Sequence, residues 1–243
     1  MNRTHDSQAR METHMVFGGT GILMSSMQVL AQEEDDFNLW FDTEHLAERV
    51  AIPGFLEARR YESLSTPVRY LQIYNAVDFE ALDSAPYRAA LAHQTPWSLH
   101  HITRFIAPTR VVGRLVHSRG QTRGAGVALV RLRPKEGARM MPSLEPYLRM
   151  LDVPGVVCAH FVEGDPELSK PVTVTGAHPG SGDDYIIFEC AGADVAQRVA
   201  SQMDQPSSSY GELVEVAAYR LRTDLTAYAL ARTRQDQACP HRG

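Results

Sequence analysis

The sequence predicts an α+β fold made of two tandem βαββαβ (ferredoxin-like) units that close into a pseudo-dimeric α/β barrel. Three observations predict it. Strand-like and helix-like segments follow each other in the order βαββαβ, and the order then repeats. A Pro-Gly pair stands at the same place in both copies, as Pro53-Gly54 and Pro154-Gly155. The 243 residues suffice for two units, each of which can cover the open sheet face of the other.

The first unit is expected over residues 20–120. An acidic stretch opens its first helix, where Asp35 and Asp36 favour the positive end of the helix dipole. Pro53-Gly54 ends that helix, and Pro86 should interrupt the second one. The strands are expected at residues 22–29, 55–63, 68–77 and 101–117, and the helices at 33–52 and 79–94.

The second unit, expected over residues 121–231, repeats the element order with little of the first unit's sequence. Its strands are expected at 126–134, 153–164, 184–191 and 212–225, and its helices at 138–152 and 193–203. The polar loop 178–184 is its largest insertion and a candidate lid. We expect residues 1–19 to be disordered or irregular and 232–243 to form a flexible tail.

Composition excludes several functional classes. The 44% hydrophobic and 22% charged residues are typical of a soluble globular protein. A net charge of -5 argues against a nucleic-acid surface. Three cysteines without metal-ligand spacing predict neither a disulfide framework nor a metal site. No apolar run is long enough for a membrane span, and no signal peptide is evident. We therefore expect a cytoplasmic protein with a small-molecule substrate and no nucleic-acid or membrane partner.

The first half carries a more specific pattern. An acidic stretch is followed by a helix with four characteristic side chains, then by a PGF turn and an Arg-Arg-Tyr strand. The residues concerned are Trp40, Phe41, Glu44 and His45, and then Arg59, Arg60 and Tyr61. Over residues 20–117 this pattern resembles the dimeric α/β-barrel superfamily, and most closely its EthD-like branch. From Gly126 onward the resemblance is to the general fold only.

The resemblance implies a pocket and an enzyme without a tightly bound cofactor. The superfamily includes polyketide cyclases, lactone isomerases, quinone-forming monooxygenases and haem proteins, and many members use no cofactor. Related barrels often assemble further, which makes a homodimer an expected assembly. Because one fold hosts many reactions, the resemblance does not fix the chemistry.

His45 is the leading candidate catalytic residue. It lies at the edge of the helix's aromatic face, and its imidazole can transfer protons near neutral pH. In the EthD-like pattern the equivalent histidine points into the cleft between helix and sheet, which the resemblance carries onto His45. The alternative is a buried histidine bonded to a backbone carbonyl. Tyr74 and Arg60, on neighbouring strands, are candidates to steady a developing oxyanion.

Aromatic and polar neighbours form a candidate substrate-binding set. Trp40 and Phe41 are either walls for a planar ligand or ordinary core. Glu44 is expected to pair with Arg59 or Arg60, or else to be a desolvated carboxylate.

Candidate binding residues also follow the predicted strands. Tyr61 and Tyr70 could hold an enolate oxygen or simply pack in the core. Gln72 shares a strand face with Tyr70 and Tyr74, opposite Leu71 and Ile73.

The last candidate of this set is one member of a histidine pair. His100 and His101 would point to opposite sides of a strand, so that only His101 is placed in the candidate binding set.

These residues support a cofactor-independent enzyme that uses a histidine acid/base on a small aromatic, polyketide-like or lactone substrate. Cyclase, isomerase, dehydratase or decarboxylase chemistry needs only a base and an oxyanion donor. One alternative is a haem enzyme of the same fold, with His160, His100 or His101 as axial ligand. Another is a binding module without catalysis.

Overall fold

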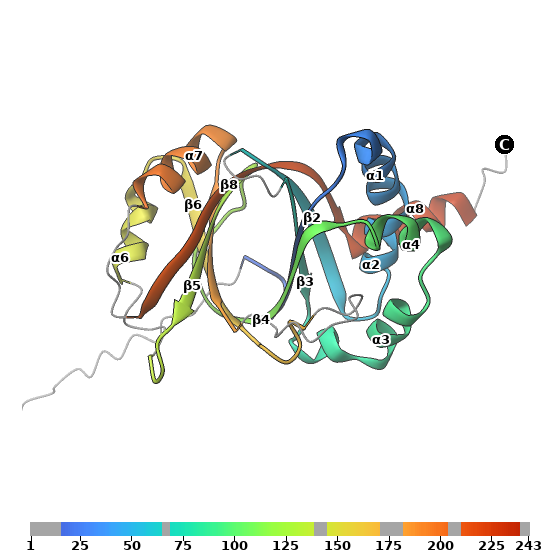
Figure 1. The fold of residues 1–243 in the computed structure, drawn as a ribbon, viewed down its shortest axis with the longest axis horizontal. Coiled ribbons are helices and arrows are strands. Elements are labelled where there is room, and N and C mark those ends of the chain that lie inside the picture. The colour runs from blue at the N-terminus through green and yellow to red at the C-terminus, as the bar shows by residue number, and fades with distance from the viewer. Residues whose placement is uncertain (1–15, 65–68, 139–144, 171–181, 204–209, 239–243) are drawn as a thin grey trace, which may run out of the picture.

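The computed structural model describes residues 16–64, 69–138, 145–170, 182–203 and 210–238 of the chain. Eight antiparallel strands close into a barrel, and the helices lie outside it (Figure 1). The predicted α+β fold of two tandem βαββαβ units is confirmed. The strands are β1 (Gly21–Gln28), β2 (Phe55–Ser63), β3 (Tyr70–Ala76), β4 (Ile106–Gly120), β5 (Gly126–Pro134), β6 (Val156–Gly164), β7 (Asp184–Cys190) and β8 (Gly211–Thr226).

The barrel has a pseudo-twofold strand order. Neighbouring strands around it are β1-β3-β2-β8-β5-β7-β6-β4. Each unit thus contributes four adjacent strands in the same internal order, with its first strand paired to its third and fourth. Closure rests on two antiparallel junctions between the units, β2 with β8 and β4 with β6. Because the barrel is closed, it has no exposed sheet edge.

The helices fall into two groups on opposite sides of the barrel (Figure 1). One group contains α1 (Glu34–Trp40), α2 (Leu46–Val50), α3 (Ala85–Ala92), α4 (Pro96–Ile102) and α8 (Ala227–Ala238). The other contains α6 (Glu145–Leu148) and α7 (Ala193–Gln202). Three hydrophobic cores result: one inside the barrel and one under each helix group.

Strand β3 shows how alternation separates two of these cores. Tyr70 and Tyr74 belong to the core under α1–α4, whereas Leu71 and Ile73 belong to the core inside the barrel. Successive side chains of a strand point to opposite faces, so a single strand serves both. The two chemically distinct faces predicted for this strand are confirmed.

The first predicted helix contains an irregularity that the sequence did not reveal. Between α1 and α2 the residues Phe41–His45 form a π-helical turn. Such turns are rare and occur often at functional sites. This one places His45 at the junction with α2.

The segment before β4 is helical, and the strand predicted from His101 is therefore wrong at its start. Helix α4 covers Pro96–Ile102, and β4 begins at Ile106. Thr95 caps the helix by accepting a hydrogen bond from the Ser98 backbone N–H at 2.9 Å, and Pro96 suits its first turn. His100 and His101 are consequently helix neighbours and do not point to opposite sides of a strand.

Other boundaries were predicted with mixed success. Pro86 does start a fresh helix, α3, capped by Ser84. The helix expected over 138–152 is represented by α6 and a 3-10 turn, Arg149–Asp152, while residues 139–144 lie outside the described part. Most of the loop 178–184 also lies outside it. Helix α8 continues through Ala238, so much of the predicted flexible tail is helical.

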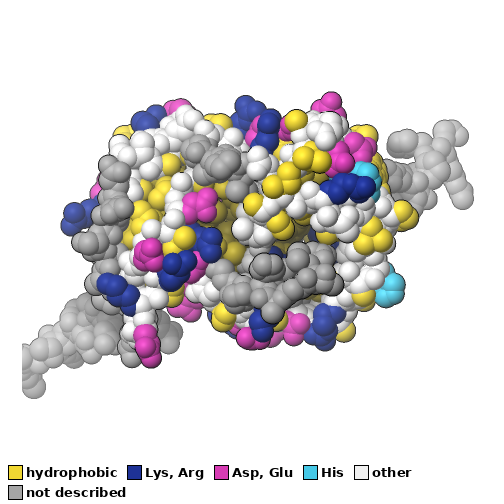
Figure 2. All heavy atoms as spheres, in the orientation of Figure 1, with side chains coloured by type: hydrophobic (Ala, Val, Ile, Leu, Met, Phe, Trp, Pro, Cys, Tyr) yellow, Lys and Arg dark blue, Asp and Glu magenta, His cyan; other side chains and the backbone are white. Residues whose placement is uncertain are grey.

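The described helices include none that is both long and apolar enough to cross a membrane. Acidic and basic side chains are intermixed over the face seen in Figure 2, without a single basic patch there.

The two Pro-Gly pairs occupy equivalent turns, each entering the second strand of its unit. Gly54 has φ +95° and Gly155 has φ +94°, a region that side chains rarely adopt. A Cβ on Gly54 would lie 2.9 Å from the Ala81 Cβ, and one on Gly155 would lie 2.8 Å from a methyl carbon of Val195. Each turn therefore needs glycine both for its conformation and for the close packing of the following helical segment.

We predict that Gly155→Ala lowers the free energy of unfolding by about 2–4 kcal/mol, through backbone strain and the clash with Val195. Gly137→Ala is the matched control, because Gly137 has φ +72° but nothing within 4 Å of the added Cβ. It should cost only about 1 kcal/mol. Urea unfolding of both variants measures the difference, and equal losses would contradict the packing argument.

Candidate functional site

A pocket of about 130 Å³ lies in the first unit, between the helices and the outer face of the sheet. Its wall is mostly apolar. The apolar side chains include Leu23 and Met27 from β1, Phe41, Leu91 from α3, Ile102 and Phe105. The polar residues are fewer and are contributed by several elements, as expected of a small-molecule site.

The helical segment beside the pocket presents three side chains to it. Phe41, His45 and Arg49 follow one another at intervals of four residues and all line the cavity. From the sheet, Tyr74 on β3 lines the same cavity. Ser25 lines it from the neighbouring strand β1. The helix spacing and the strand alternation therefore bring these groups together.

His45 has an unusual environment for a histidine inside a protein. Its ring lies 4.5 Å from the Trp40 ring and 4.9 Å from the Phe41 ring, measured between centroids. Its Nδ1 is buried without a hydrogen-bond partner among the described residues. The alternative was a structural histidine bonded to a backbone carbonyl, and the described residues supply no such bond to Nδ1. A buried polar atom without a partner costs free energy, which indicates that the group has another role.

The protonation states of His45 and Tyr74 follow from burial and nearby cations. Burial lowers the pKa of His45 well below its usual 6.5, and the charges of Arg49 and Arg60 lower it further. The imidazole is therefore neutral at pH 7 and can accept a proton. Burial raises the pKa of Tyr74, so its hydroxyl stays protonated and can donate a hydrogen bond.

Arg49 is a pocket residue that the sequence analysis missed. It is only 5% exposed, and its Nη2 donates to the Gln94 side chain at 2.9 Å. Its Nε and Nη1 are buried and have no hydrogen-bond partner among the described residues. The nearest carboxylate, on Glu48, is 4.0 Å away and partly exposed. Its position four residues after His45 was the available signal.

A second arginine reaches the same pocket. Arg110 on β4 donates to the Leu168 carbonyl oxygen and, at 3.4 Å, to the Tyr87 hydroxyl. The residues described around the cavity include no aspartate or glutamate. The pocket of this net acidic chain therefore has a cationic and apolar wall.

Arg60, proposed as an oxyanion donor, lies outside the pocket wall. It is fully buried, and its Nη1 donates to Asp42 at 2.7 Å. Its Nη2 donates to the Asn38 side chain. The guanidinium also lies against aromatic rings, 4.6 Å from the Phe41 centroid and 4.8 Å from that of Tyr70. These contacts make it part of the structure that supports the helix.

Two helix residues of the predicted site join α4 to the first helix. Glu44 accepts hydrogen bonds from Thr95 Oγ1 and Ser98 Oγ, so the predicted ion pair with Arg59 or Arg60 is wrong. Asp42 takes the place of Glu44 as the partner of Arg60. Trp40 is fully buried and donates from Nε1 to Ser98 Oγ at 3.2 Å. It forms the support behind the His45 ring.

The remaining strand candidates divide between the two faces of the sheet. Tyr61 is in the barrel interior, with its buried hydroxyl unpartnered. Tyr70 shares the face of Tyr74, but its hydroxyl donates to Glu34 and accepts from Asn38 Nδ2 at 3.2 Å.

Gln72 is fully buried, and its side chain accepts a hydrogen bond from Ser25 at 2.9 Å. The structure thus places Gln72 beside the pocket residue Ser25, its cross-strand neighbour, and Tyr61 away from the pocket.

His101 is buried behind Trp40 and belongs to a possible cation site outside the pocket. Its ring stacks on Trp40 at 4.9 Å. Ligand atoms of Asp36, His100 and His101 all lie within 4.8 Å of one another. Arg104 donates to His100 at 3.0 Å, and its positive charge opposes a cation there. These three residues are the group in the described chain that could hold a metal ion.

His160, named for the haem alternative, lies inside the barrel and not in the pocket. It is fully buried, shares a 2.8 Å hydrogen bond with Ser118 Oγ and packs 4.4 Å from the Phe17 ring. Burial lowers its pKa to about 3, with a smaller effect from Arg123. A haem bound to His160 would have to displace the interior packing. Because His101 is itself buried, the exposed His100 is left as the accessible candidate for that alternative.

Comparisons with known proteins support the fold. No family model and no curated sequence matches the chain. Among solved structures, an anthrone oxidase-like protein aligns with a TM-score of 0.57 at 10% identity, over 86% of this chain and 94% of that one. A Fusobacterium nucleatum protein provisionally assigned as a monooxygenase gives 0.52 at 8% identity, over 86% and 95%. The chain has the dimeric α/β-barrel fold. Likeness at these identities extends to the fold alone.

The buried histidine of the barrel interior gives a prediction on acid stability. In the folded chain His160 stays neutral down to about pH 3, whereas in the unfolded chain it binds a proton below about 6.5. The unfolded state therefore binds more protons between these values, and stability falls as the pH drops below 6.5. At about pH 4.5 this group alone should cost about 2–3 kcal/mol relative to neutral pH.

We predict that His160→Gln removes this dependence while still allowing a hydrogen bond to Ser118. Between about pH 7 and pH 4.5 the variant should lose about 2–3 kcal/mol less unfolding free energy than the natural chain. His100→Gln, at an exposed histidine, should leave the pH dependence unchanged. Denaturant unfolding at both pH values measures this, and parallel pH curves for the natural chain and His160→Gln would contradict it.

Proposed function

We propose that this chain is an enzyme without a tightly bound cofactor, in which His45 removes a proton from a small aromatic or lactone-type substrate. The single observation that carries the proposal is the state of His45: a neutral imidazole, lacking any hydrogen-bond partner in the described chain, in the wall of an apolar pocket. A base in this state is ready to accept a proton in its first step.

The neighbouring groups can stabilise the charge that proton removal creates. The substrate loses a proton to His45 and becomes an enolate or phenolate, while His45 becomes a cation. Tyr74, which stays protonated, is placed to donate to the developing oxygen. The new anion and the protonated imidazole attract one another in the apolar pocket, which offsets the low proton affinity of free His45.

The fate of the anion decides the reaction class. Return of the proton to another carbon is isomerisation, and attack on an internal carbonyl is cyclisation. Reaction with dioxygen would be an oxidation, the class named by the anthrone oxidase-like neighbour. All of these begin with the same proton transfer. Membership of the EthD-like branch is part of this proposal and rests on the pattern from Trp40 to Tyr61.

We predict that the protein accelerates exchange of the acidic C–H of 2-coumaranone or methyl phenylacetate for deuterium in D₂O. Both compounds carry such a hydrogen between a carbonyl group and an aromatic ring. His45→Gln should slow the catalysed exchange by about 10²–10⁴-fold, the contribution of a general base. Proton NMR follows exchange, and an oxygen electrode shows whether dioxygen is consumed.

His100→Gln is the control, because His100 is an exposed histidine outside the pocket. It should exchange as fast as the natural chain. Exchange of these probes that is unchanged in His45→Gln would remove the proposed base. Binding of the probes without any exchange would instead favour the binding module.

The pH profile of the exchange rate should report a base with a lowered pKa. Because the active form of His45 is neutral and its pKa lies well below 6.5, kcat/KM should be level from about pH 6.5 to 8. It should fall only on the acid side of that range. A rate that rises through pH 6.5 to 7.5 would indicate an ordinary, solvent-exposed histidine.

A further inference from the structure

We propose that the pocket recognises a negatively charged ligand of about one aromatic ring, specifically a monocyclic aromatic carboxylate, through Arg49. This inference rests on the proposed function for the location of the site and deepens it by naming the class of substrate. The juxtaposition that carries it is an incompletely partnered, buried arginine in an apolar cavity whose described wall has no acidic residue.

Arg49 is a buried cation with little compensation for its charge. A buried cation is normally paired, because removing it from water without compensation is unfavourable. Arg49 is 5% exposed, yet within the described part of the chain only its Nη2 has a hydrogen-bond partner, the neutral Gln94. Its contact with Glu48 at 4.0 Å is at the limit of an ion pair and reaches a partly exposed side chain. The guanidinium therefore retains most of its capacity to bind an anion.

The rest of the pocket wall also favours a negatively charged ligand. Arg110 adds a second cation, which donates to the carbonyl oxygens of Leu168 and Lys170 and to the Tyr87 hydroxyl. His45 is neutral, so it does not repel an incoming anion or compete for it. Two arginines in a described wall that has no aspartate or glutamate make the cavity positive inside a chain of net charge -5.

Size and lining define the uncharged part of the ligand. The cavity measures about 130 Å³, which is near the roughly 150 Å³ of an apolar cavity known to take up benzene. Phe41, Phe105 and Leu91 supply apolar surface for one ring. A system of three fused rings would extend beyond this volume. A carboxylate is the anion of choice because guanidinium and carboxylate groups match in shape and hydrogen-bonding capacity.

The test compares benzoate with benzyl alcohol, an uncharged molecule of similar size, by isothermal titration calorimetry on the full chain. Benzoate should bind to the natural protein at least about tenfold more tightly than benzyl alcohol. Arg49→Gln should remove this preference, weakening benzoate by about tenfold or more and benzyl alcohol by less than about twofold. Arg49→Lys, which keeps the charge, should retain part of the preference.

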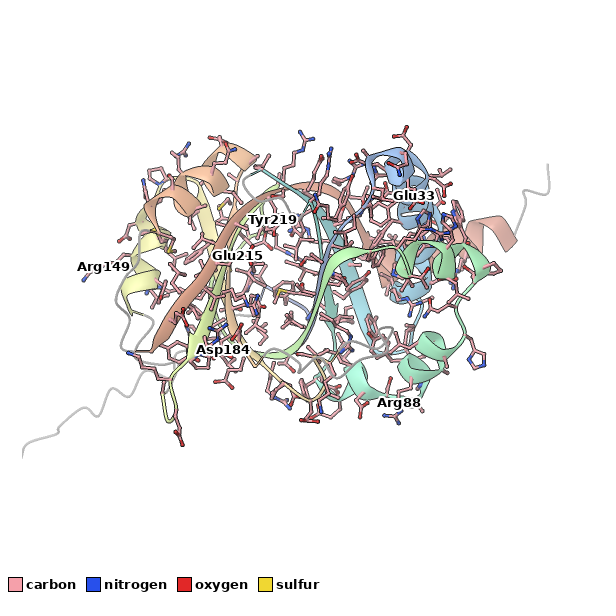
Figure 3. All side chains as sticks on the ribbon, viewed as in Figure 1. Glu33, Arg88, Arg149, Asp184, Glu215 and Tyr219 are labelled. Atoms are coloured by element: carbon pink, nitrogen blue, oxygen red, sulfur yellow. The ribbon has the colours of Figure 1, made fainter. Side chains whose placement is uncertain are left out.

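Arg88→Gln is the matched control for a change of net charge. Arg88 projects from α3 at the outer edge of the molecule, where it pairs with Asp83 at 2.9 Å (Figure 3). This variant should bind both probes as the natural chain does. An equal loss of benzoate affinity in Arg88→Gln would mean that only the overall charge matters, and would overturn the site.

The comparison of the two probes on the natural chain needs no variant, so the proposal remains testable if Arg49→Gln fails to fold. Equal binding of benzoate and benzyl alcohol, or no binding of benzoate at millimolar concentration, overturns it. If His45→Gln still binds benzoate and exchange is unchanged in that variant, the proposed base is wrong and the anion site is supported. If exchange depends on His45 but benzoate is not preferred, the base is supported and the anion site is wrong.

Discussion

The structure depends on closure of the barrel through the β2–β8 and β4–β6 junctions. A four-stranded sheet has two faces to cover, and closure turns one face of each unit into a shared interior. Phe17, Leu71 and Ile187 are among the residues of that interior. The outer face of each unit is then left to the helices outside the barrel, and α8, which follows β8, joins the helices over the first unit. For this reason the first unit can form a pocket between helices and sheet without weakening the contact between the units.

Most strands could be predicted because their signal is local. Alternating side chains between turn residues define β2, β3 and β5 to within two residues, and the Pro-Gly pairs mark equivalent turns. Helix α4 was missed although Thr95-Pro96 is a typical helix start, because the segment has no clear apolar period. Arg49 was missed because the sequence does not show that its guanidinium lacks a carboxylate hydrogen-bond partner. Its one hydrogen-bond partner in the described chain, Gln94, is 45 residues away.

The ion pairs of the first helix show why side-chain roles are harder to predict than elements. Asp42 and Glu44 both lie in the π-helical turn Phe41–His45. Counting 100° per residue assumes a regular α-helix, and this turn breaks that assumption just where the two acids must be assigned. Asp42 consequently pairs with Arg60, and Glu44 turns to Thr95 and Ser98.

Two buried arginines, Arg60 and Arg49, differ in how far the surrounding residues compensate their charge. Arg60 has a carboxylate, an amide oxygen and aromatic rings around it, so its desolvation is compensated within the chain. Arg49 is also buried, at 5% exposed, and has little such compensation. Evolution tolerates such a local cost where a site needs it and tends to remove it elsewhere. The uncompensated charge therefore marks the pocket more clearly than any single sequence motif does.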